Sequence, residues 1–235
     1  MVCLKYMPEL KNNSMNIKIS ETCQIPNLKE IYLQYFNKTT GFFVEVGAFD
    51  GESWSNTSCL ADLEWTGIYV EPVPEYINLC QQRHKHNNVK FEQCAIGINN
   101  TDSKIHVVGG LSTLSDSMHI AHKNIFEPAY FANETELTVL TCRLDTILQK
   151  HNVPKNFDLL VVDVEGYEQQ VFESFSLSEH RPKMIIAELS DVHPNYNNYP
   201  DIQSSHSMIR KFIVSHRYKE IYIDAINTIF YDTYE

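Results

Sequence analysis

The run Phe42-Phe43-Val44-Glu45-Val46-Gly47-Ala48-Phe49-Asp50-Gly51 is the part of this chain from which its architecture follows. Its first five residues are a short, largely apolar run that predicts a buried β-strand. The two glycines predict a turn, and a helix is expected to begin near Ser53. Strand, glycine turn and helix together let a backbone approach a nucleotide-like ligand and present amide N–H groups to it. Glycine suits such a turn because it has no Cβ atom to block the approach or to disfavour positive φ.

Glu45 distinguishes this turn from one that binds a dinucleotide. The dinucleotide fingerprint has glycine at that position and serves a pyrophosphate. A carboxylate there repels phosphate but suits a cation, and S-adenosylmethionine carries a sulfonium and an ammonium group with no phosphate. The pattern Glu45-x-Gly47-x-x-x-Gly51 therefore favours S-adenosylmethionine over NAD as the cofactor.

A second apolar run, Gly67-Ile68-Tyr69-Val70, ends in Glu71-Pro72. In Rossmann-like folds the acid at the end of the second strand binds the ribose hydroxyls of the cofactor. Two strand ends that each carry a carboxylate form a more specific combination than either one alone. A βαβ unit whose acids are incidental is the alternative interpretation, because short motifs discriminate loosely.

Length and composition indicate one soluble globular domain. The chain has 235 residues, of which 43% are hydrophobic and 21% charged. Its net charge of −11 argues against a protein that follows nucleic-acid phosphates. No apolar run is long enough for a membrane span, and the N-terminus lacks the apolar region of a signal peptide. Six scattered cysteines without a C-x-x-C pair predict reduced thiols, so we expect a cytoplasmic protein.

Apolar periodicity predicts an alternation of strands and helices along the chain. Strands are expected at 42–46, 67–71, 89–96, 104–108, 137–142, 158–166, 183–189, 218–225 and 228–232. Helices are expected at 27–36, 53–63, 74–86, 144–148, 167–175 and 207–216. This order predicts an α/β fold, a Rossmann-like three-layer sandwich with a mostly parallel sheet and a C-terminal antiparallel strand pair.

The chain is expected to divide into an N-terminal helical extension or cap, residues 1–41, and one domain, residues 42–235. Within that domain, residues 109–136 are rich in Ser, His and aromatic side chains and show little regular pattern. A long irregular segment in a compact domain is usually functional, so this insertion is expected to act as a lid.

Ligands of such sheets bind outside the carboxyl ends of the strands. This rule brings several polar side chains toward one crevice: Glu45, Glu71, Gln93, Asp163, Glu165, Glu188 and His193. The segment Gln93-Cys94-Ala95 ends the third expected strand, where the adenine ring is expected.

Four runs, taken in order, resemble the FkbM-type methyltransferases, which have the class I S-adenosylmethionine-dependent fold. They are FVEVGAFDG at 43–51, YVEP at 69–72, RLDTIL at 143–148 and DVEGYE at 163–168. The resemblance covers roughly residues 42–190, and residues 1–41 and much of 109–136 match no part of the family pattern. It implies methylation of a hydroxyl on a sugar or natural-product acceptor.

The resemblance also implies which residues contact the cofactor. The implied contacts are Glu45, Gly47, Asp50, Gly51, Glu71 and Asp163. Ala48 and Pro72 adjoin these contacts, Cys94 and Ala95 lie where the adenine ring is expected, and these four complete the cofactor-binding set that we predict.

Methyl transfer to a hydroxyl requires alignment of the reacting atoms and benefits from a base. We predict His193 and Glu165 as the catalytic residues, since His193 follows the fifth strand of the main sheet and has a suitable pKa. The alternatives are that His193 is a loop residue ahead of Pro194 and that Glu165 caps a helix N-terminus. Three histidines in or near the insertion are weaker candidates: His106, His119 and His122.

A metal is not favoured, although Asp163, Glu188 and Asp191 are expected at adjacent strand ends and carboxylate oxygens suit Mg²⁺. Aromatic and amide side chains gather at Phe126, Tyr130, Phe131 and in the segment 193–199. They suit a carbohydrate acceptor, and they equally suit a packed lid.

Two other functions compete with a methyltransferase. One is a non-catalytic cofactor- or glycan-binding protein on the same scaffold, and the other is a nicotinamide oxidoreductase, which Glu45 disfavours. Nucleic-acid methylation is not supported, because the sequence has neither an Asn-Pro-Pro-Tyr-like motif nor a basic groove. We therefore expect a small-molecule or carbohydrate acceptor and no nucleic-acid partner; the sequence indicates no oligomeric state.

Overall fold

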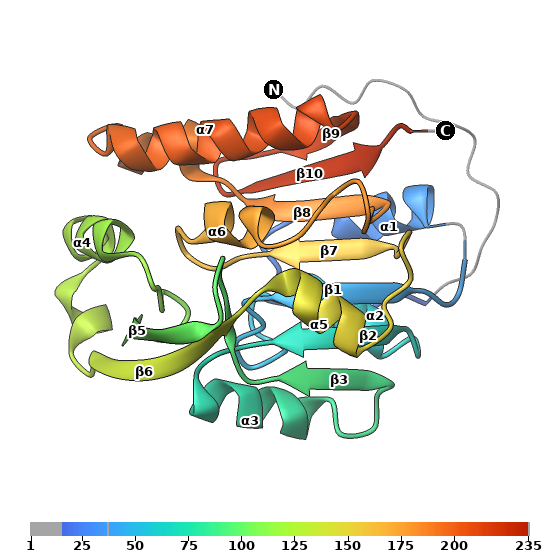
Figure 1. Ribbon diagram of the computed structural model, residues 1–235, viewed down its shortest axis with the longest axis horizontal. Coiled ribbons are helices and arrows are strands. Elements are labelled where there is room, and N and C mark those ends of the chain that lie inside the picture. Colours follow the sequence, from blue (N-terminus) through green and yellow to red (C-terminus); the bar gives the residue numbers. More distant parts are fainter. Residues whose placement is uncertain (1–15, 37, 235) are drawn as a thin grey trace.

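A seven-stranded sheet organises the computed structural model, which describes residues 16–36 and 38–234 (Figure 1). The strand order is β3-β2-β1-β7-β8-β10-β9. The strands are β1 (Phe42–Val46), β2 (Thr66–Val70), β3 (Val89–Glu92), β7 (Leu159–Val162), β8 (Met184–Glu188), β9 (Tyr218–Ile223) and β10 (Asn227–Asp232). The first five of these run parallel, whereas β10 pairs antiparallel with β8 and β9. The predicted mostly parallel sheet with a C-terminal antiparallel pair is confirmed.

Helices cover both faces of the sheet, which gives the three predicted layers (Figure 1). Val44 and Val46 of β1 face α5 (Leu144–Lys150), α6 (Glu168–Glu173) and α7 (Pro200–Ser215). Phe43 faces α1 (Leu28–Tyr35), α2 (Ser58–Ala61) and α3 (Pro74–Arg83) on the other side. Successive side chains of a strand point to opposite faces, so one apolar run supplies both cores.

The strands expected at 104–108 and 137–142 are confirmed and pair with each other in a second sheet, whereas the segment between them, expected to be irregular, carries helices. A second sheet has the order β4-β6-β5, built from β4 (Ala95–Ile96), β5 (Thr101–Val107) and β6 (Thr135–Cys142). Between β5 and β6 lie α4 (Asp116–Ile125) and the 3-10 helix η1 (Pro128–Phe131). The Ser115 side chain caps α4 by accepting a hydrogen bond from the backbone N–H of Met118.

Three predicted element boundaries are wrong. The strand expected at 89–96 splits into β3 and β4, which belong to different sheets. The helix expected at 53–63 shortens to α2, because Trp54 has a φ of 57° that no α-helix accepts. The last helix begins earlier than expected, at Pro200, a residue that suits the first turn of a helix.

Residues 16–36 of the expected N-terminal cap pack on the sheet face that α1 covers. Ile17, Ile25 and Tyr32 are buried in the same cluster as Trp65. Residues 1–15 of that predicted extension lie outside the described residues. In the described part of the chain, no helix is both long and apolar enough to cross a membrane.

Gly47 is required where the chain leaves β1. Its φ is +90°, and a Cβ atom there would lie 1.6 Å from the backbone carbonyl oxygen of Asp163. Backbone on both sides is fixed, since Gly47 N donates to Val70 O at 3.0 Å and Asp163 N donates to Val46 O at 3.0 Å. No side chain fits without separating β1 from β7.

Replacing Gly47 with alanine is therefore expected to lower the free energy of unfolding by about 4 kcal/mol or more, the range of severe core lesions. Thermal or denaturant unfolding followed by circular dichroism measures this loss. Gly97→Ala is the matched control, because a Cβ atom there has its nearest neighbour at 3.4 Å and the backbone φ is ordinary. Similar stabilities for the two variants would contradict the close approach.

Candidate active site

A cleft opens at the carboxyl ends of β1, β2 and β7, as the strand-end rule predicts. Its volume is about 790 Å³, counted out to the open mouth. Nine of the predicted site residues line it: Glu45, Gly47, Ala48, Glu71, Pro72, Cys94, Ala95, Asp163 and Glu165.

Glu45 lies at the base of the glycine turn and is buried. Thr57 Oγ1 donates to its Oε2 atom at 2.5 Å, and Ser55 Oγ donates to the same atom at 3.3 Å. Burial raises the pKa of the Glu45 carboxyl to about 7, although these hydrogen bonds oppose the shift. The carboxyl is therefore held in place by the loop that precedes α2.

Glu71 joins the glycine turn to the end of β2. Its Oε2 atom accepts from Phe49 N at 3.1 Å, and its Oε1 atom accepts from Val73 N at 2.9 Å. Burial raises the pKa of this carboxyl to about 7 as well. The side chain is thus fixed on the wall of the cleft before any ligand arrives.

Asp50 and Gly51 do not line the cleft, although both are predicted cofactor contacts. Asp50 Oδ1 accepts from Glu52 N at 2.9 Å and from Ser53 N at 2.7 Å, so this carboxylate closes the turn. Gly51 has a φ of +78°, and its carbonyl oxygen accepts from His84 Nε2 at 2.8 Å. Both residues support the turn from its outer side.

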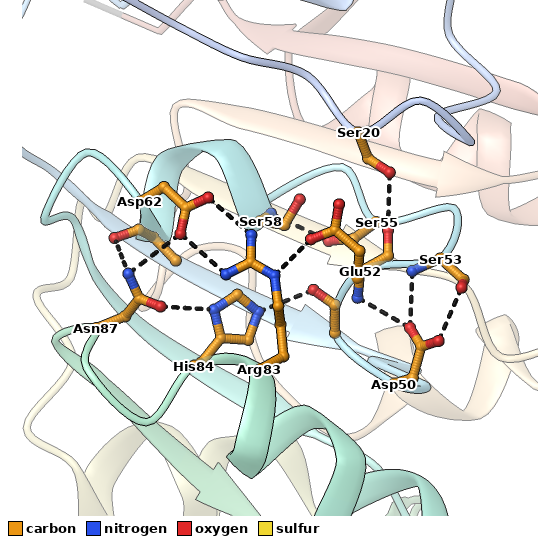
Figure 2. A network of polar contacts seen from close by, with 12 residues as sticks. Ser20, Asp50, Glu52, Ser53, Ser55, Ser58, Asp62, Arg83, His84 and Asn87 are labelled. Carbon is orange, nitrogen blue, oxygen red and sulfur yellow. Dashed lines mark hydrogen bonds and ion pairs between the residues drawn. The ribbon is translucent and has the colours of Figure 1, made fainter.

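A polar network holds this outer side of the turn against α3 (Figure 2). Arg83 Nε donates to Glu52 Oε2 at 2.6 Å, and Arg83 Nη2 pairs with Asp62 Oδ2 at 2.7 Å. Ser20 Oγ donates to the carbonyl oxygen of Glu52 at 3.0 Å, which adds the N-terminal segment. The guanidinium therefore joins the turn to the end of α2.

Four aromatic residues line the cleft and were not predicted: Phe49, Trp54, Tyr76 and Tyr167. The Phe49 ring lies 4.6 Å from that of Tyr76 and 5.7 Å from that of Trp54, between centroids. Tyr76 OH accepts from Gly109 N at 3.1 Å. The rings of Phe49, Trp54 and Tyr76 connect the glycine turn to the insertion, and the aromatic residue inside the turn was the available sequence signal.

Three carboxyls meet at the other end of the cleft. Oxygen atoms of Asp163, Glu165 and Glu188 all lie within 4.8 Å of one another, and Asp163 and Glu165 face the cleft. Burial raises the pKa of each, and the neighbouring carboxyls raise those of Glu165 and Glu188 further. The structure thus places Glu165 beside a predicted cofactor residue.

The loop that carries Glu165 is fixed from two sides. Thr113 Oγ1 of the insertion donates to the carbonyl oxygen of Glu165 at 2.6 Å. Glu168 accepts from Val164 N at 3.2 Å and from Gly166 N at 3.1 Å. Glu168, the first residue of α6, therefore holds the backbone of the loop that carries Glu165.

Two predicted residues lie elsewhere. His193 does not line the cleft, and its Nδ1 atom accepts from Asn195 N at 3.1 Å within its own turn. Asp191 belongs to a different contact, because Arg210 donates to its two oxygens at 2.7 and 2.6 Å. The expected grouping of Asp191 with Asp163 and Glu188 is therefore wrong, and Glu165 takes its place.

The histidines of the insertion have distinct surroundings. His122 is fully buried, and its Nε2 atom lies 3.4 Å from Glu165 Oε2. The rings of His106 and His119 stack with centroids 4.0 Å apart. Each of these two already contacts a carboxylate, at 2.8 Å for Asp116 and 3.0 Å for Glu134.

Comparison with known proteins identifies the scaffold. A family profile described as the methyltransferase FkbM domain matches residues 45–220. No curated protein sequence matches the chain. Solved structures with a similar fold include an O-methyltransferase from Bacillus cereus in complex with SAH, at 14% identity and a TM-score of 0.49, covering 93% of this chain and 84% of that one. A putative O-methyltransferase from Klebsiella pneumoniae gives 11% identity and a TM-score of 0.49, covering 92% and 84%.

The buried Glu71 carboxyl predicts a specific dependence of stability on pH. It ionises near pH 4.5 when exposed and near pH 7 in the folded chain, so the folded state holds an extra proton between these values. Stability therefore falls as pH rises through this window. Glu71→Gln is expected to reduce the fall between pH 5 and pH 8 by on the order of 2 kcal/mol.

Denaturant unfolding across this pH range tests the prediction. The readout is the slope of stability against pH rather than its level, because glutamine also loses one of the two backbone contacts. Glu75→Gln, at an exposed position on α3, is the matched control. An unchanged slope in Glu71→Gln would show that Glu71 is ionised normally in the folded chain.

Proposed function

The chain belongs to the FkbM methyltransferase family, and from this we propose that it transfers the methyl group of S-adenosylmethionine to a hydroxyl of a small-molecule or carbohydrate acceptor. The observation that carries the proposal is the charge of the cleft. Four carboxyls line it, those of Glu45, Glu71, Asp163 and Glu165, and among its described lining residues there is no Lys or Arg. A cationic cofactor suits these walls, whereas the phosphates of NAD do not.

Each part of the cofactor has a matching group in the cleft. The Glu71 carboxyl is suited to the ribose hydroxyls, because each of its oxygens can accept a further hydrogen bond beside that of the amide it binds now. Cys94, Ala95 and Ile105 offer an apolar wall to the adenine ring. Gly47 allows the backbone to approach the cofactor closely.

Glu165 is the group best placed to take the proton of the acceptor hydroxyl. It faces the cleft, and burial raises its pKa, which makes its ionised form a stronger base than an exposed carboxylate. S-adenosylmethionine supplies an activated methyl group on its sulfonium. The new oxygen–carbon bond forms as the carbon–sulfur bond breaks, neutral S-adenosylhomocysteine leaves, and the hydroxyl proton passes to Glu165. His193 lies outside the cleft and has no part in this proposal.

Isothermal titration tests the choice of cofactor. Micromolar binding of S-adenosylmethionine and no binding of NADH are expected, with an affinity loss of about tenfold or more in Glu71→Ala, since each ribose hydroxyl loses an acceptor. Glu75→Ala on α3 is the control. If the folded protein binds no S-adenosylmethionine, the methyltransferase proposal is wrong. If it binds NADH more tightly than S-adenosylmethionine, the oxidoreductase is the better proposal.

Turnover tests the role of Glu165. With S-adenosylmethionine and a panel of sugars and hydroxylated natural products, Glu165→Gln is expected to lower kcat by about 10²- to 10⁴-fold, the usual contribution of a general base. S-adenosylmethionine affinity should fall far less than kcat, and His193→Ala should remain active. Loss of turnover in His193→Ala with retention in Glu165→Gln would reverse the assignment. Cofactor binding without turnover on any acceptor would favour the non-catalytic alternative.

A further inference from the structure

A group of side chains of the kinds that bind metal ions lies in the insertion. His106 belongs to β5, His119 belongs to α4, and Glu134 directly precedes β6, at the left of Figure 1. One donor atom of each residue lies within 4.8 Å of the donor atoms of the other two. None of the three is among the described residues that line the cleft. The group is therefore separate from the site of the proposed function.

The donor atoms suit zinc. Two imidazole nitrogens and one carboxylate oxygen, with water in the fourth position, form a known zinc-binding set, whereas Mg²⁺ prefers oxygen ligands. Zn²⁺ binds such atoms at about 2.0–2.2 Å, so two ligand atoms of a tetrahedral site lie roughly 3.4 Å apart. His119 Nε2 and Glu134 Oε1 already lie 3.0 Å apart. The rest of the distance is small enough for side-chain rotation to close.

The two histidines now have carboxylates of the same region as their partners. His106 Nε2 lies 2.8 Å from Asp116 Oδ1, and His119 Nε2 lies 3.0 Å from Glu134 Oε1. Lys123 binds the other oxygen of Glu134, Oε2, at 2.7 Å, which leaves Oε1 available. The Asp116 side chain is 90% exposed, so water replaces its contact with His106. An ion can therefore take over the two imidazoles without leaving a buried partner unsatisfied.

His119 is an independent observation at the same place. It is 6% exposed, and its Nδ1 atom has no hydrogen-bond partner among the described residues. A buried polar atom without a partner is costly. In a metal-bound histidine both ring nitrogens are normally engaged, one by the ion and one by a hydrogen-bond acceptor. The buried ring of His119 has one polar contact where a metal ligand has two.

We propose that His106, His119 and Glu134 bind one Zn²⁺ ion, with water completing a tetrahedral site. The two rings now stack with their planes at 2°. Parallel rings cannot both direct a lone pair at the same ion, so binding turns the imidazoles out of their stack. The ion then joins β5, α4 and the residue before β6. This inference does not depend on the proposed methyl transfer and adds no step to its chemistry.

A cross-link at this place acts on one wall of the cleft. Ile105, next to His106 on β5, lines the cleft. The backbone of His106 exchanges hydrogen bonds with that of Thr113, whose side chain holds the carbonyl oxygen of Glu165. Zinc at this position therefore fixes the insertion relative to the loop that carries Glu165.

Direct zinc binding tests the inference without any turnover. The full-length chain, freed of any affinity tag and treated with a chelator, competes for Zn²⁺ with a chromophoric chelator of known affinity. One Zn²⁺ per chain is expected, with a micromolar or lower dissociation constant. His106→Asn and Glu134→Gln are expected to weaken binding by about tenfold or more, since even the outer contacts of a metal site contribute that much. His86→Asn, at an exposed position, is the matched control and binds as the unaltered chain does.

Cobalt and thermal unfolding give two further readouts. Co²⁺ in place of Zn²⁺ is expected to show the intense visible absorption of tetrahedral coordination, which Glu134→Gln weakens. Zinc is expected to raise the melting temperature of the unaltered chain and of His86→Asn, because it binds the folded state. The same zinc concentration is expected to leave the melting temperature of Glu134→Gln nearly unchanged.

Both substituted side chains are partly exposed, at 19% for His106 and 23% for Glu134, and circular dichroism checks that each variant folds. Absence of zinc binding by the folded chain at submillimolar concentration would overturn the inference. Undiminished binding by both His106→Asn and Glu134→Gln would overturn it as well, because the ion would then lie elsewhere.

Discussion

The close approach between Gly47 and the carbonyl oxygen of Asp163 determines how β1 and β7 leave the sheet. Beyond the last paired residues, backbone hydrogen bonds still join the ends of β1, β2 and β7. Glu71 and Asp163 follow these same strand ends. The spacing of their carboxyls is therefore set by the backbone, and the flexibility of the side chains has little influence on it. A site built in this way is organised before a ligand binds, which lowers the cost of binding.

Among the described residues, no Lys or Arg forms an ion pair with the carboxyls that line the cleft. Arginines are present nearby, but Arg83 binds Glu52 and Asp62 on the outer side of the turn, and Arg210 binds Asp191. The acids outside the cleft are paired with arginines, whereas the carboxyls that line the cleft are not. This difference favours positively charged ligands. Burial amplifies the selection, because the interaction between charges is stronger where water is excluded.

The sequence alone predicted the sheet and most of the residues that line the cleft. Each buried strand is visible as an apolar run, and an acidic residue lies at or near its end. Glu45, Glu71, Asp163 and Glu165 were found in this way. Contacts between distant segments could not be predicted from the sequence. Arg210 binds Asp191, and His193 lies outside the cleft in a local turn closed by Asn195. The split of 89–96 was hidden as well, since β3 and β4 share the same alternation although they pair with different strands. The helix or sheet against which a residue packs depends on tertiary contacts, and the periodicity of the sequence does not encode these contacts.

The insertion completes its own hydrogen-bond ladder. β5 and β6 pair along seven residue positions, from Thr101 opposite Thr141 to Val107 opposite Thr135, and the connection to the rest of that sheet is the short strand β4. Because this hairpin does not share a register with the seven-stranded sheet, its sequence can drift without shifting the strand ends that carry the carboxyls. This hairpin and the segment between its strands contribute Ile105, Gly109 and Leu114 to the cleft, so one wall of the cleft is built on a different sheet from the strand ends that carry the carboxyls.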